Sequence, residues 1–487
     1  MNLLKKFLFL SVSLLTAGKA LQADCCGSRG LYVPRSITTD NTYSLALSNF
    51  DIYHRYDCPT DRPWVNFYAT PFYQESREDC EFGRYFLPNN RSSISVREDG
   101  SGDLNSLWFN VIAPTGTSFS SDLSLNPERR LFGAHFYTRF NLQNWVCYNV
   151  WFSVAFAAYR LEHCLGLCES NVQNSGTIPG FPNMTRALNN PEWTTGHFAN
   201  GVQCETGVDD VEFKLGYDHF YCDNYHVGLY LVGTAPTGEG SCSGRVFEPL
   251  VGSNHGSFGA GFNADLLAYD FCGHNIVFMT DLKYRYVFSH CENRSFDLRN
   301  NGDFSRYLLV ANQNSPFVST PGINVLTTKV DVEPRSTIEF WAALNYAWCS
   351  FDVEVGYNLW WRDCENICRP SFCQTDVGVF DLAGQCCSTV PTSASNANIT
   401  QGARGINVAP SDAAFTPITA GDLSLSSAAQ PSALTHKVYG ALAYRTEVFC
   451  TPVLLGLGGA YEFARDRSCN ACWPDHWSVW GKVGLSY

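Results

Sequence analysis

Cysteine is the residue type with the most versatile chemistry in this sequence, and several cysteines have the close spacing of metal ligands. The chain contains 21 cysteines. The closely spaced groups are Cys164 with Cys168, Cys364 with Cys368 and Cys373, and Cys469 with Cys472. A structural zinc site needs four Cys or His ligands at suitable spacing, and only His163 adjoins one of these groups. The pattern therefore favours disulfides, and we expect neither a metal nor a cofactor.

Charged side chains form the second chemically capable set, because they recur at alternate positions of otherwise apolar segments. The acids are Glu212, Asp218, Asp265, Asp281, Glu339, Asp352, Glu354 and Glu462, and the bases are Arg139, Lys214, Lys283, Arg285, Arg362, Lys437, Arg445 and Lys482. A charge that faces lipid costs about 2–4 kcal/mol at the membrane midplane, so these side chains need water or partners. We expect them to line a wet channel or to pair inside a plugged one. The eight acids balance the eight bases, so the ion selectivity of such a channel cannot be inferred from them.

No arrangement of residues indicates catalysis. Neither a Ser–His–Asp nor a Cys–His set occurs with a supporting sequence context. No glycine-rich phosphate loop precedes a helix. We therefore expect no enzyme activity.

The elements that position the charged residues are long strands. In Ile338–Trp348 and Phe351–Trp361, apolar or aromatic side chains alternate with mostly polar or small ones, which is the period of a β-strand. A strand of eleven residues is about 36 Å long, and it spans about 28 Å when it is tilted by about 40°. This length matches a bilayer core, and the two strands are joined by a very short turn.

The same unit recurs along the chain, and its connections alternate between short and long. From Phe132 onward, hairpins with short turns are separated by long loops, as in outer-membrane β-barrels. We predict an all-β, antiparallel up-and-down barrel of about fourteen strands, with twelve or sixteen as alternatives. The count includes weaker strands at Tyr43–Tyr53, Trp64–Tyr73 and Leu104–Ile112. Short turns would face the periplasm and long loops the exterior.

The beginning of the chain indicates export. Residues 1–23 have the basic start, apolar stretch and small residues of a secretory signal. We expect residues 24–103 to hold an N-terminal periplasmic segment with the first strands, and residues 104–487 to form the transmembrane barrel. The net charge of −13 argues against nucleic acid as a partner.

The sequence resembles bacterial outer-membrane porins. Val483, Leu485 and the final Tyr487 resemble the C-terminal assembly signal of that family. The many cysteines, with segments such as 69–73 and 83–88, resemble the cysteine-rich major outer-membrane proteins of Chlamydia-like bacteria and Legionella. The resemblance implies passive diffusion of small hydrophilic solutes, disulfide-linked envelope partners and, by analogy with trimeric porins, a homo-oligomer. A non-conducting structural or adhesin-type protein is the alternative, and the internal charges argue against a carrier of apolar solutes.

The predicted topology sorts the cysteines into two groups. The periplasmic group is Cys147, Cys222, Cys272, Cys349 and Cys450. The extracellular group is Cys164, Cys168, Cys204, Cys242, Cys291, Cys364, Cys368, Cys373, Cys386, Cys387, Cys469 and Cys472. A disulfide requires Cα atoms within about 7 Å, so the two groups cannot pair across the barrel. We expect the outer group to connect the loops. We expect the inner group to pair with Cys25, Cys26, Cys58 or Cys80, or with other chains, unless its thiols stay free at the rim.

Overall fold

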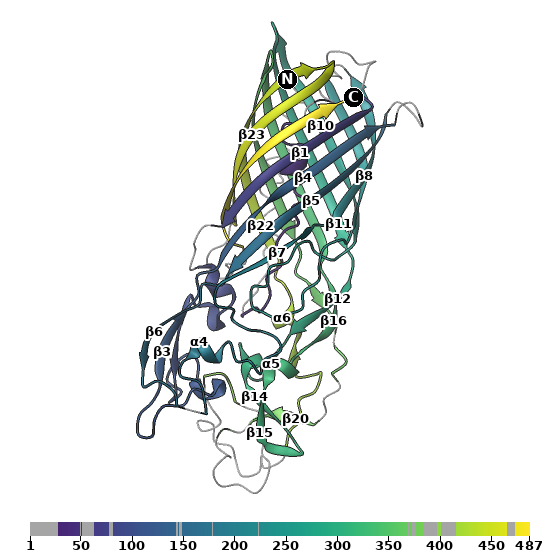
Figure 1. Ribbon diagram of the computed structural model, residues 1–487. Coiled ribbons are helices and arrows are strands. Elements are labelled where there is room, and N and C mark those ends of the chain that lie inside the picture. Colours follow the sequence, from purple (N-terminus) through teal and green to yellow (C-terminus); the bar gives the residue numbers. More distant parts are fainter. Residues whose placement is uncertain are drawn as a thin grey trace.

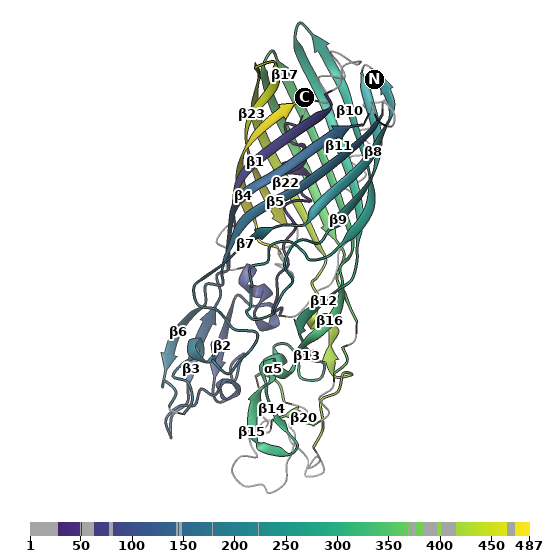
Figure 2. The same ribbon diagram turned by 45° about the vertical axis from the view of Figure 1, so that its right-hand side comes forward.

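The chain forms a closed β-barrel of tilted strands with a folded layer of loops at one end (Figures 1 and 2). The computed structural model describes residues 28–48, 50, 63–76, 81–142, 145, 149–177, 179–222, 224–368, 370–372, 376–380, 382, 397–400, 415–464 and 473–487. The barrel strands are β1 (Val65–Ser76), β4 (Glu128–Asn141), β5 (Val150–Cys164), β8 (Val211–Cys222), β9 (Tyr225–Ala235), β10 (Ser257–Phe271), β11 (His274–Val287), β17 (Arg335–Trp348), β18 (Phe351–Arg362), β22 (Ala433–Val448), β23 (Thr451–Ala464) and β24 (His476–Ser486).

Each barrel strand pairs antiparallel with its neighbours in chain order, and β24 pairs with β1 to close the ring. One additional strand, β7 (Val202–Val208), pairs with β5 where β8 does not reach. The predicted closed antiparallel barrel is therefore confirmed, with twelve strands among the described residues rather than fourteen. Connections of a few residues lie at the end that also holds the C-terminus, called the turn end here, and the long connections lie at the opposite, loop end.

Two of the weaker strand predictions are wrong. Leu104–Ile112 contains a 3₁₀ helix, η4 (Ser106–Phe109), because Asn105 accepts a hydrogen bond from the Leu107 N–H and caps it, and Asn110 ends it in the left-handed conformation. Tyr43–Tyr53 begins within a short helix, α2 (Asn41–Leu45), and residues 51–53 lie outside the described part of the chain. The described residues of these two segments pair with no barrel strand.

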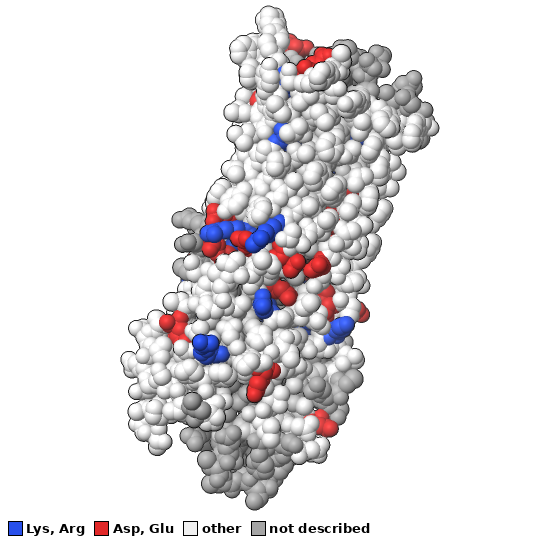
Figure 3. All heavy atoms as spheres, in the orientation of Figure 1, with Lys and Arg blue, Asp and Glu red and all other residues white. Residues whose placement is uncertain are grey.

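The outer surface of the barrel is apolar. Side chains such as Leu229, Val355, Leu442 and Leu457 are 54–67% exposed on it. Figure 3 shows this surface nearly free of charge along most of its height, and charged side chains gather near the loop end. Arg130, with Glu75 and Glu128, forms an ion-paired group at that level. A closed barrel with this outer band is the architecture that crosses a membrane with strands.

Aromatic side chains on the inner surface lie over glycines of the next strand. A side-chain carbon at Gly261 would come within 2.1 Å of the Tyr230 ring, and one at Gly356 would come within 2.3 Å of the Tyr439 ring. Because glycine leaves this space, large inward rings can lie flat against the wall. The remaining interior therefore has room for another segment of the chain.

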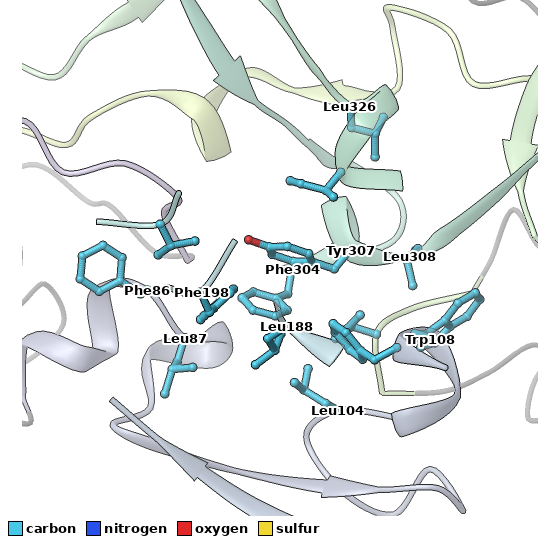
Figure 4. Packing of buried hydrophobic residues seen from close by; sticks show 14 of the residues in the cluster. Phe86, Leu87, Leu104, Trp108, Leu188, Phe198, Phe304, Tyr307, Leu308 and Leu326 are labelled. Carbon is cyan, nitrogen blue, oxygen red and sulfur yellow. The ribbon is translucent and has the colours of Figure 1, made fainter. Parts of the chain in front are cut away.

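The long loops fold on each other at the loop end and share a hydrophobic core. Figure 4 shows side chains from separate loops, among them Trp108, Leu188, Phe198 and Tyr307, packed together. The loop strands are β2 (Ser93–Arg97), β3 (Ser120–Ser124), β6 (Cys168–Gln173), β12 (His290–Ser295), β13 (Asp297–Leu298), β14 (Leu309–Asn312), β15 (Ser315–Pro321), β16 (Thr327–Glu333), β19 (Asn366–Ile367), β20 (Val377–Val379) and β21 (Leu423–Ser424). The loop helices are α4 (Met184–Ala187), α5 (Gly322–Val325), α6 (Leu425–Ala428), η2 (Phe82–Tyr85), η3 (Pro88–Asn90), η4 and η5 (Ser305–Tyr307).

The helices are all short. Among the described residues, no helix has both the length and the apolar composition needed to cross a bilayer.

Candidate functional site

The interior of the barrel is occupied by the N-terminal segment, which we call the plug (residues 28–48 and 50). Its residues are mostly buried, and α2 lies at its centre with Asp40 as the N-terminal cap. The plug runs from the loop end, where Arg29 contacts Tyr85 of the loop layer, toward the turn end, where Phe50 contacts Tyr68 of β1. The sequence predicted a periplasmic segment within residues 24–103, and for the range as a whole this stays a prediction. Within it, Tyr32 packs in the core of the loop layer, and residues 33–48 lie inside the barrel, where the wall supplies partners for their polar groups.

The first group of contacts joins the plug to β17 and its neighbours. The guanidinium of Arg35 donates to Glu339 and, at 3.2 Å, to the side-chain oxygen of Asn358. Glu339 also lies 3.1 Å from the ammonium of Lys283. Lys283 lies 3.1 Å from one oxygen of Glu212, and Lys214 lies 3.2 Å from the other. A continuous row of alternating charges thus runs from the plug across the wall.

Asn41 is the residue of α2 that interacts with this row. Its backbone N–H donates to Glu339 at 2.7 Å, and its side-chain amide donates to Asp281 at 2.8 Å. Its side-chain oxygen accepts from Lys283 at 3.0 Å and from Lys214 at 3.4 Å. One residue, through its backbone N–H and its side-chain amide, therefore contacts two acids and two bases, and this arrangement positions the start of the helix.

A second group holds the plug on the opposite side of the barrel. Lys437 of β22 forms an ion pair with Asp40 and lies 2.8 Å from Glu462 of β23. His476 lies 3.2 Å from Glu462. Asp40 also lies 3.4 Å from Arg35, which connects this group to the first one.

A third group holds the half of the plug nearest the turn end. Glu354 accepts from the Leu47 N–H at 3.2 Å and from the Tyr439 hydroxyl at 2.8 Å. Lys482 donates to the backbone oxygen of Tyr43 at 2.9 Å and to the Ser48 hydroxyl at 3.1 Å. The barrel wall thus satisfies backbone groups of the plug that water would otherwise serve.

The other predicted side chains also lie inside the barrel, and among them Arg362 contacts the plug by donating to the backbone oxygen of Val33 at 2.8 Å. Asp218 accepts from the Trp151 indole at 2.9 Å, lies 3.4 Å from Arg139 and contacts His226, which reaches Asp265 at 3.0 Å. Arg445 lies 2.9 Å from Asp352 near the turn end. Eleven of the sixteen predicted charges form ion pairs, counting the contact of Asp265 with His226. Asp281, Glu354 and Lys482 are held by hydrogen bonds to neutral groups. Arg285 and Arg362 contact no carboxylate within the described residues.

Sequence reasoning missed the plug residues that complete these groups, chiefly Arg35, Asp40 and Asn41. Their signal is weak: Arg35 and Asp40 are isolated charges in a segment that is otherwise uncharged from Gly30 to Phe50. Two such charges near a barrel with many internal acids and bases are consistent with a segment that enters the lumen. Nothing local identifies their partners.

A polar cluster of His255, Glu292 and Arg294 lies at the loop end, outside the barrel strands. His255 lies 2.7 Å from Glu292, and Glu292 lies 2.7 Å from Arg294. Burial opposes the charged His255, but the hydrogen bond and charge of Glu292 prevail and raise the pKa of His255. Burial likewise opposes the charged Glu292, but the charge of Arg294 and the contact with His255 lower the pKa of Glu292 to about 2.

This cluster predicts a pH-dependent stability. The contribution of His255 is complete below its ordinary pKa of 6.5 and is lost as pH rises through the raised value. The contribution of Glu292 is complete above its ordinary value of 4.5 and is lost as pH falls toward about 2. The Tm should therefore be higher at about pH 5.5 than at about pH 8.5, and His255→Gln should reduce that difference. His274→Gln, at the turn end, is the control; an equal pH dependence in both variants would contradict the assignment.

The described cysteines lie at both ends of the barrel and form no disulfide with one another. Cys272, Cys349 and Cys450 are exposed in three different short turns. Cys164, Cys168, Cys204, Cys242, Cys291, Cys364 and Cys368 lie at the loop end, and their thiols are free. The remaining predicted cysteines, Cys25, Cys26, Cys58, Cys80, Cys147, Cys373, Cys386, Cys387, Cys469 and Cys472, lie outside the described residues, as does the side chain of Cys222. Disulfide pairing therefore stays a prediction.

A metal site is not formed by the part of the chain that is described. No group of three or more His, Cys, Asp or Glu side chains there is arranged to hold an ion.

Comparison with known proteins yields solved barrels of low similarity. No protein-family model matches the sequence, and no curated protein matches it. An outer-membrane channel from Pseudomonas putida F1 is 9% identical, with 88% of this chain and 97% of that chain covered and a TM-score of 0.36. The toluene transporter TodX from Pseudomonas putida is 10% identical, with 96% and 98% covered and a TM-score of 0.29. A FadL homologue from Pseudomonas aeruginosa is 8% identical, with 94% and 99% covered and a TM-score of 0.28.

Such values assign neither a family nor a solute to the chain. The geometry of the chain itself defines the class of protein, because a closed antiparallel barrel with an apolar outer band is the form in which strands cross a bacterial outer membrane. The protein is a β-barrel of the bacterial outer membrane.

Proposed function

We propose that this protein is an outer-membrane channel for small hydrophilic solutes, and that its own N-terminal segment closes the lumen. The observation that carries the proposal is the polar attachment of the plug. Between residues 33 and 41, the plug contacts the wall chiefly through ion pairs and hydrogen bonds from Arg35, Asp40 and Asn41. Thr38 adds a backbone N–H bond to Asp209 at 2.9 Å.

The two halves of the plug are held differently, and this difference supports a movable half. Tyr43, Ala46, Leu47 and Phe50 belong to a hydrophobic cluster with the wall, to which the half before Asn41 contributes Ile37. Releasing the apolar half, from Tyr43 onward, would expose apolar surface, at about 25 cal/mol per Å². Releasing the polar half, residues 33–41, would replace its buried ion pairs with contacts to water. Buried ion pairs contribute little net stability, so this release costs less. We infer that residues 33–41 move while the apolar half stays in place.

Passage through this barrel therefore depends on the plug and is not permanently open. The sequence predicted general diffusion through a charged lumen, with a plugged interior as the alternative. The plugged arrangement is the one in the structure, and the charged wall favours hydrophilic solutes once the polar half moves. The absence of enzyme activity and of a cofactor stays a prediction.

Solute uptake into vesicles tests the proposal. The full-length protein in liposomes should admit arabinose slowly. The double variant Asp40→Asn/Glu339→Gln should admit it faster, because the loss of both carboxylates removes the ion pairs that hold the polar half of the plug. The paired variant Arg130→Gln, on the outside of the barrel, should match the wild-type rate. No uptake by wild type and double variant, with the protein shown to be folded, would instead favour a non-conducting structural or adhesin-type protein.

A second role in the envelope is favoured by the exposed cysteines of the short turns. Cys272, Cys349 and Cys450 have reachable thiols in separate hairpins on one rim of the barrel. A thiol exposed in an oxidising compartment forms disulfides with other chains. We propose that these side chains connect the barrel to neighbouring envelope proteins, as its resemblance to the cysteine-rich major outer-membrane proteins also implies.

Non-reducing gels of intact envelopes test this role. We expect high-mass species that collapse to one band with reductant, and that decrease when Cys222, Cys272 and Cys349 are replaced by Ser. Replacing Cys242 and Cys291, at the loop end, is the matched control and should leave these species unchanged if the turn end makes the links. A monomer band without reductant would contradict the network.

A further inference from the structure

A cavity remains between the polar half of the plug and the barrel wall, and it is lined by a buried arginine. The cavity has a volume of about 80 Å³ and is lined on the plug side by Val33, Pro34 and Arg35. Arg285 of β11 lines the wall side and is only 7% exposed. Within the described residues, Arg285 forms neither a hydrogen bond nor an ion pair. The donors of a guanidinium in this state need water or a ligand to satisfy them.

The strand register places two more donors beside Arg285. Arg285 is the partner of Thr337 on β17, and Thr337 is the partner of Arg362 on β18. Neighbouring strands are about 4.8 Å apart, so the two arginine Cα atoms are separated by about 10 Å with the threonine between them. All three side chains are at least nine-tenths buried and line the same cavity. They form a row of guanidinium, hydroxyl and guanidinium groups.

Arg362 also has no direct acid partner among the described residues. Its guanidinium donates to the backbone oxygen of Val33 at 2.8 Å and to the backbone oxygen of Pro431 at 3.3 Å, with a weak contact to Gln430 at 3.5 Å. These acceptors are neutral. The row therefore carries two positive charges that no contacting carboxylate balances.

The acids near the cavity are already engaged by other groups. Glu212, which senses the charge of Arg285, has its two oxygens near Lys214 and Lys283. Glu292 contacts His255 and Arg294, and Asp210 accepts from the Ser253 hydroxyl at 2.6 Å. An acid supplied from outside the protein would therefore meet two arginines that contact no carboxylate within the described residues, and Arg362 would keep its bonds to neutral acceptors.

We propose that this row is a binding site for small organic carboxylates with a short apolar body. The planar guanidinium matches a carboxylate with two parallel hydrogen bonds. The lining also contains the apolar Val33, Pro34, Val287 and Trp360, which suit an apolar chain. Its four acids, Asp210, Glu292, Asp363 and Glu365, each contact a basic group or a hydroxyl of the protein. The volume exceeds the roughly 30 Å³ share of one water in the liquid and so admits more than a single water. The site adjoins residues 33–41, the half of the plug that we infer to move, and it therefore identifies small organic carboxylates as the solutes of the proposed channel. Its role in transport rests on the proposed channel function.

Equilibrium binding tests the site without requiring transport. Butyrate should bind the full-length protein in detergent at least 10-fold more tightly than butyramide, which has the same shape without the charge. Arg285→Gln should weaken butyrate binding at least 10-fold, Arg362→Gln several-fold and Thr337→Val by a smaller factor. Arg130→Gln, which removes an exposed arginine outside the barrel, should bind butyrate like wild type.

The stability of Arg285→Gln separates ligand binding from a structural role. Because Arg285 has no hydrogen-bond or ion-pair partner in the described part of the chain, its removal should leave Tm unchanged or raise it, whereas a structural arginine would lower Tm when replaced. Equal affinity for butyrate and butyramide in the wild-type protein, or unchanged butyrate affinity in Arg285→Gln, would overturn the site. Selective butyrate binding without solute uptake would support the binding site and refute the channel. Solute uptake without butyrate binding would support the channel and refute the binding site.

Discussion

Replacing Glu339 with Ala should destabilise the folded barrel by about 3–5 kcal/mol, the usual cost of removing one member of a buried ion pair. Glu339 is 2% exposed and contacts Arg35 and Lys283. It also accepts from the Asn41 N–H and from the Asn358 amide, each at 2.7 Å. Without it, two buried cations lose an acid partner and the plug loses two attachments. The temperature at which the folded, fast-migrating gel band is lost should fall accordingly.

Glu333→Ala is the matched control for this change. Glu333 lies six positions earlier in β16 at the loop end, where it contacts Tyr286 and Asn366 outside the barrel. Its replacement should shift the same transition little, because exposed polar contacts contribute little. Equal shifts in Glu339→Ala and Glu333→Ala would show that the plug contacts do not stabilise the barrel.

Introducing Arg at Leu442 should disturb membrane insertion by about 2–4 kcal/mol, because the side chain would enter the apolar band near the bilayer midplane. Leu442 is 59% exposed near the middle of β22, and its register partners are Val353 and Leu457. The urea midpoint for folding into lipid vesicles measures this effect. We expect Leu442→Arg to fold at lower urea than wild type.

Val318 provides the control for that experiment. It is 64% exposed, close to the value for Leu442, but it lies on β15 in the loop layer. Val318→Arg should leave the folding midpoint unchanged because water surrounds the new charge. A similar loss in both variants would mean that exposure of an apolar side chain, and not its depth in lipid, determines the cost.

The barrel could be predicted because its signal is local. The alternation in Ile338–Trp348 and Phe351–Trp361 reproduces β17 and β18 closely, and the inward charges follow from the same period of two. A register shift by one residue would reverse every side chain, so a single well-patterned strand indicates which residues face inward. The same reasoning placed all sixteen charged candidates on the inner wall.

The plug could not be predicted because its partners are distant in sequence. Tyr43, Leu45 and Leu47 alternate as a strand would, but Asp40 caps a helical turn, and the contacts that fix it come from Glu339, 298 positions beyond Asn41. Local periodicity cannot distinguish a short buried helix from a buried strand.

The loop layer was missed for a related reason. Trp108 and Tyr307 lie in one hydrophobic core although they belong to different loops. Each loop alone shows few apolar residues in a regular pattern, so its fold depends on surfaces that only the closed barrel brings together.

The central claim is that the plug closes a channel, and single-channel current in planar bilayers tests it most directly. The wild-type protein should show rare, small current steps, and Asp40→Asn/Glu339→Gln should show frequent, larger ones because the polar half of the plug is released. Large, steady current through wild type that is identical in the variant would contradict the account, because the lumen would then conduct regardless of the plug.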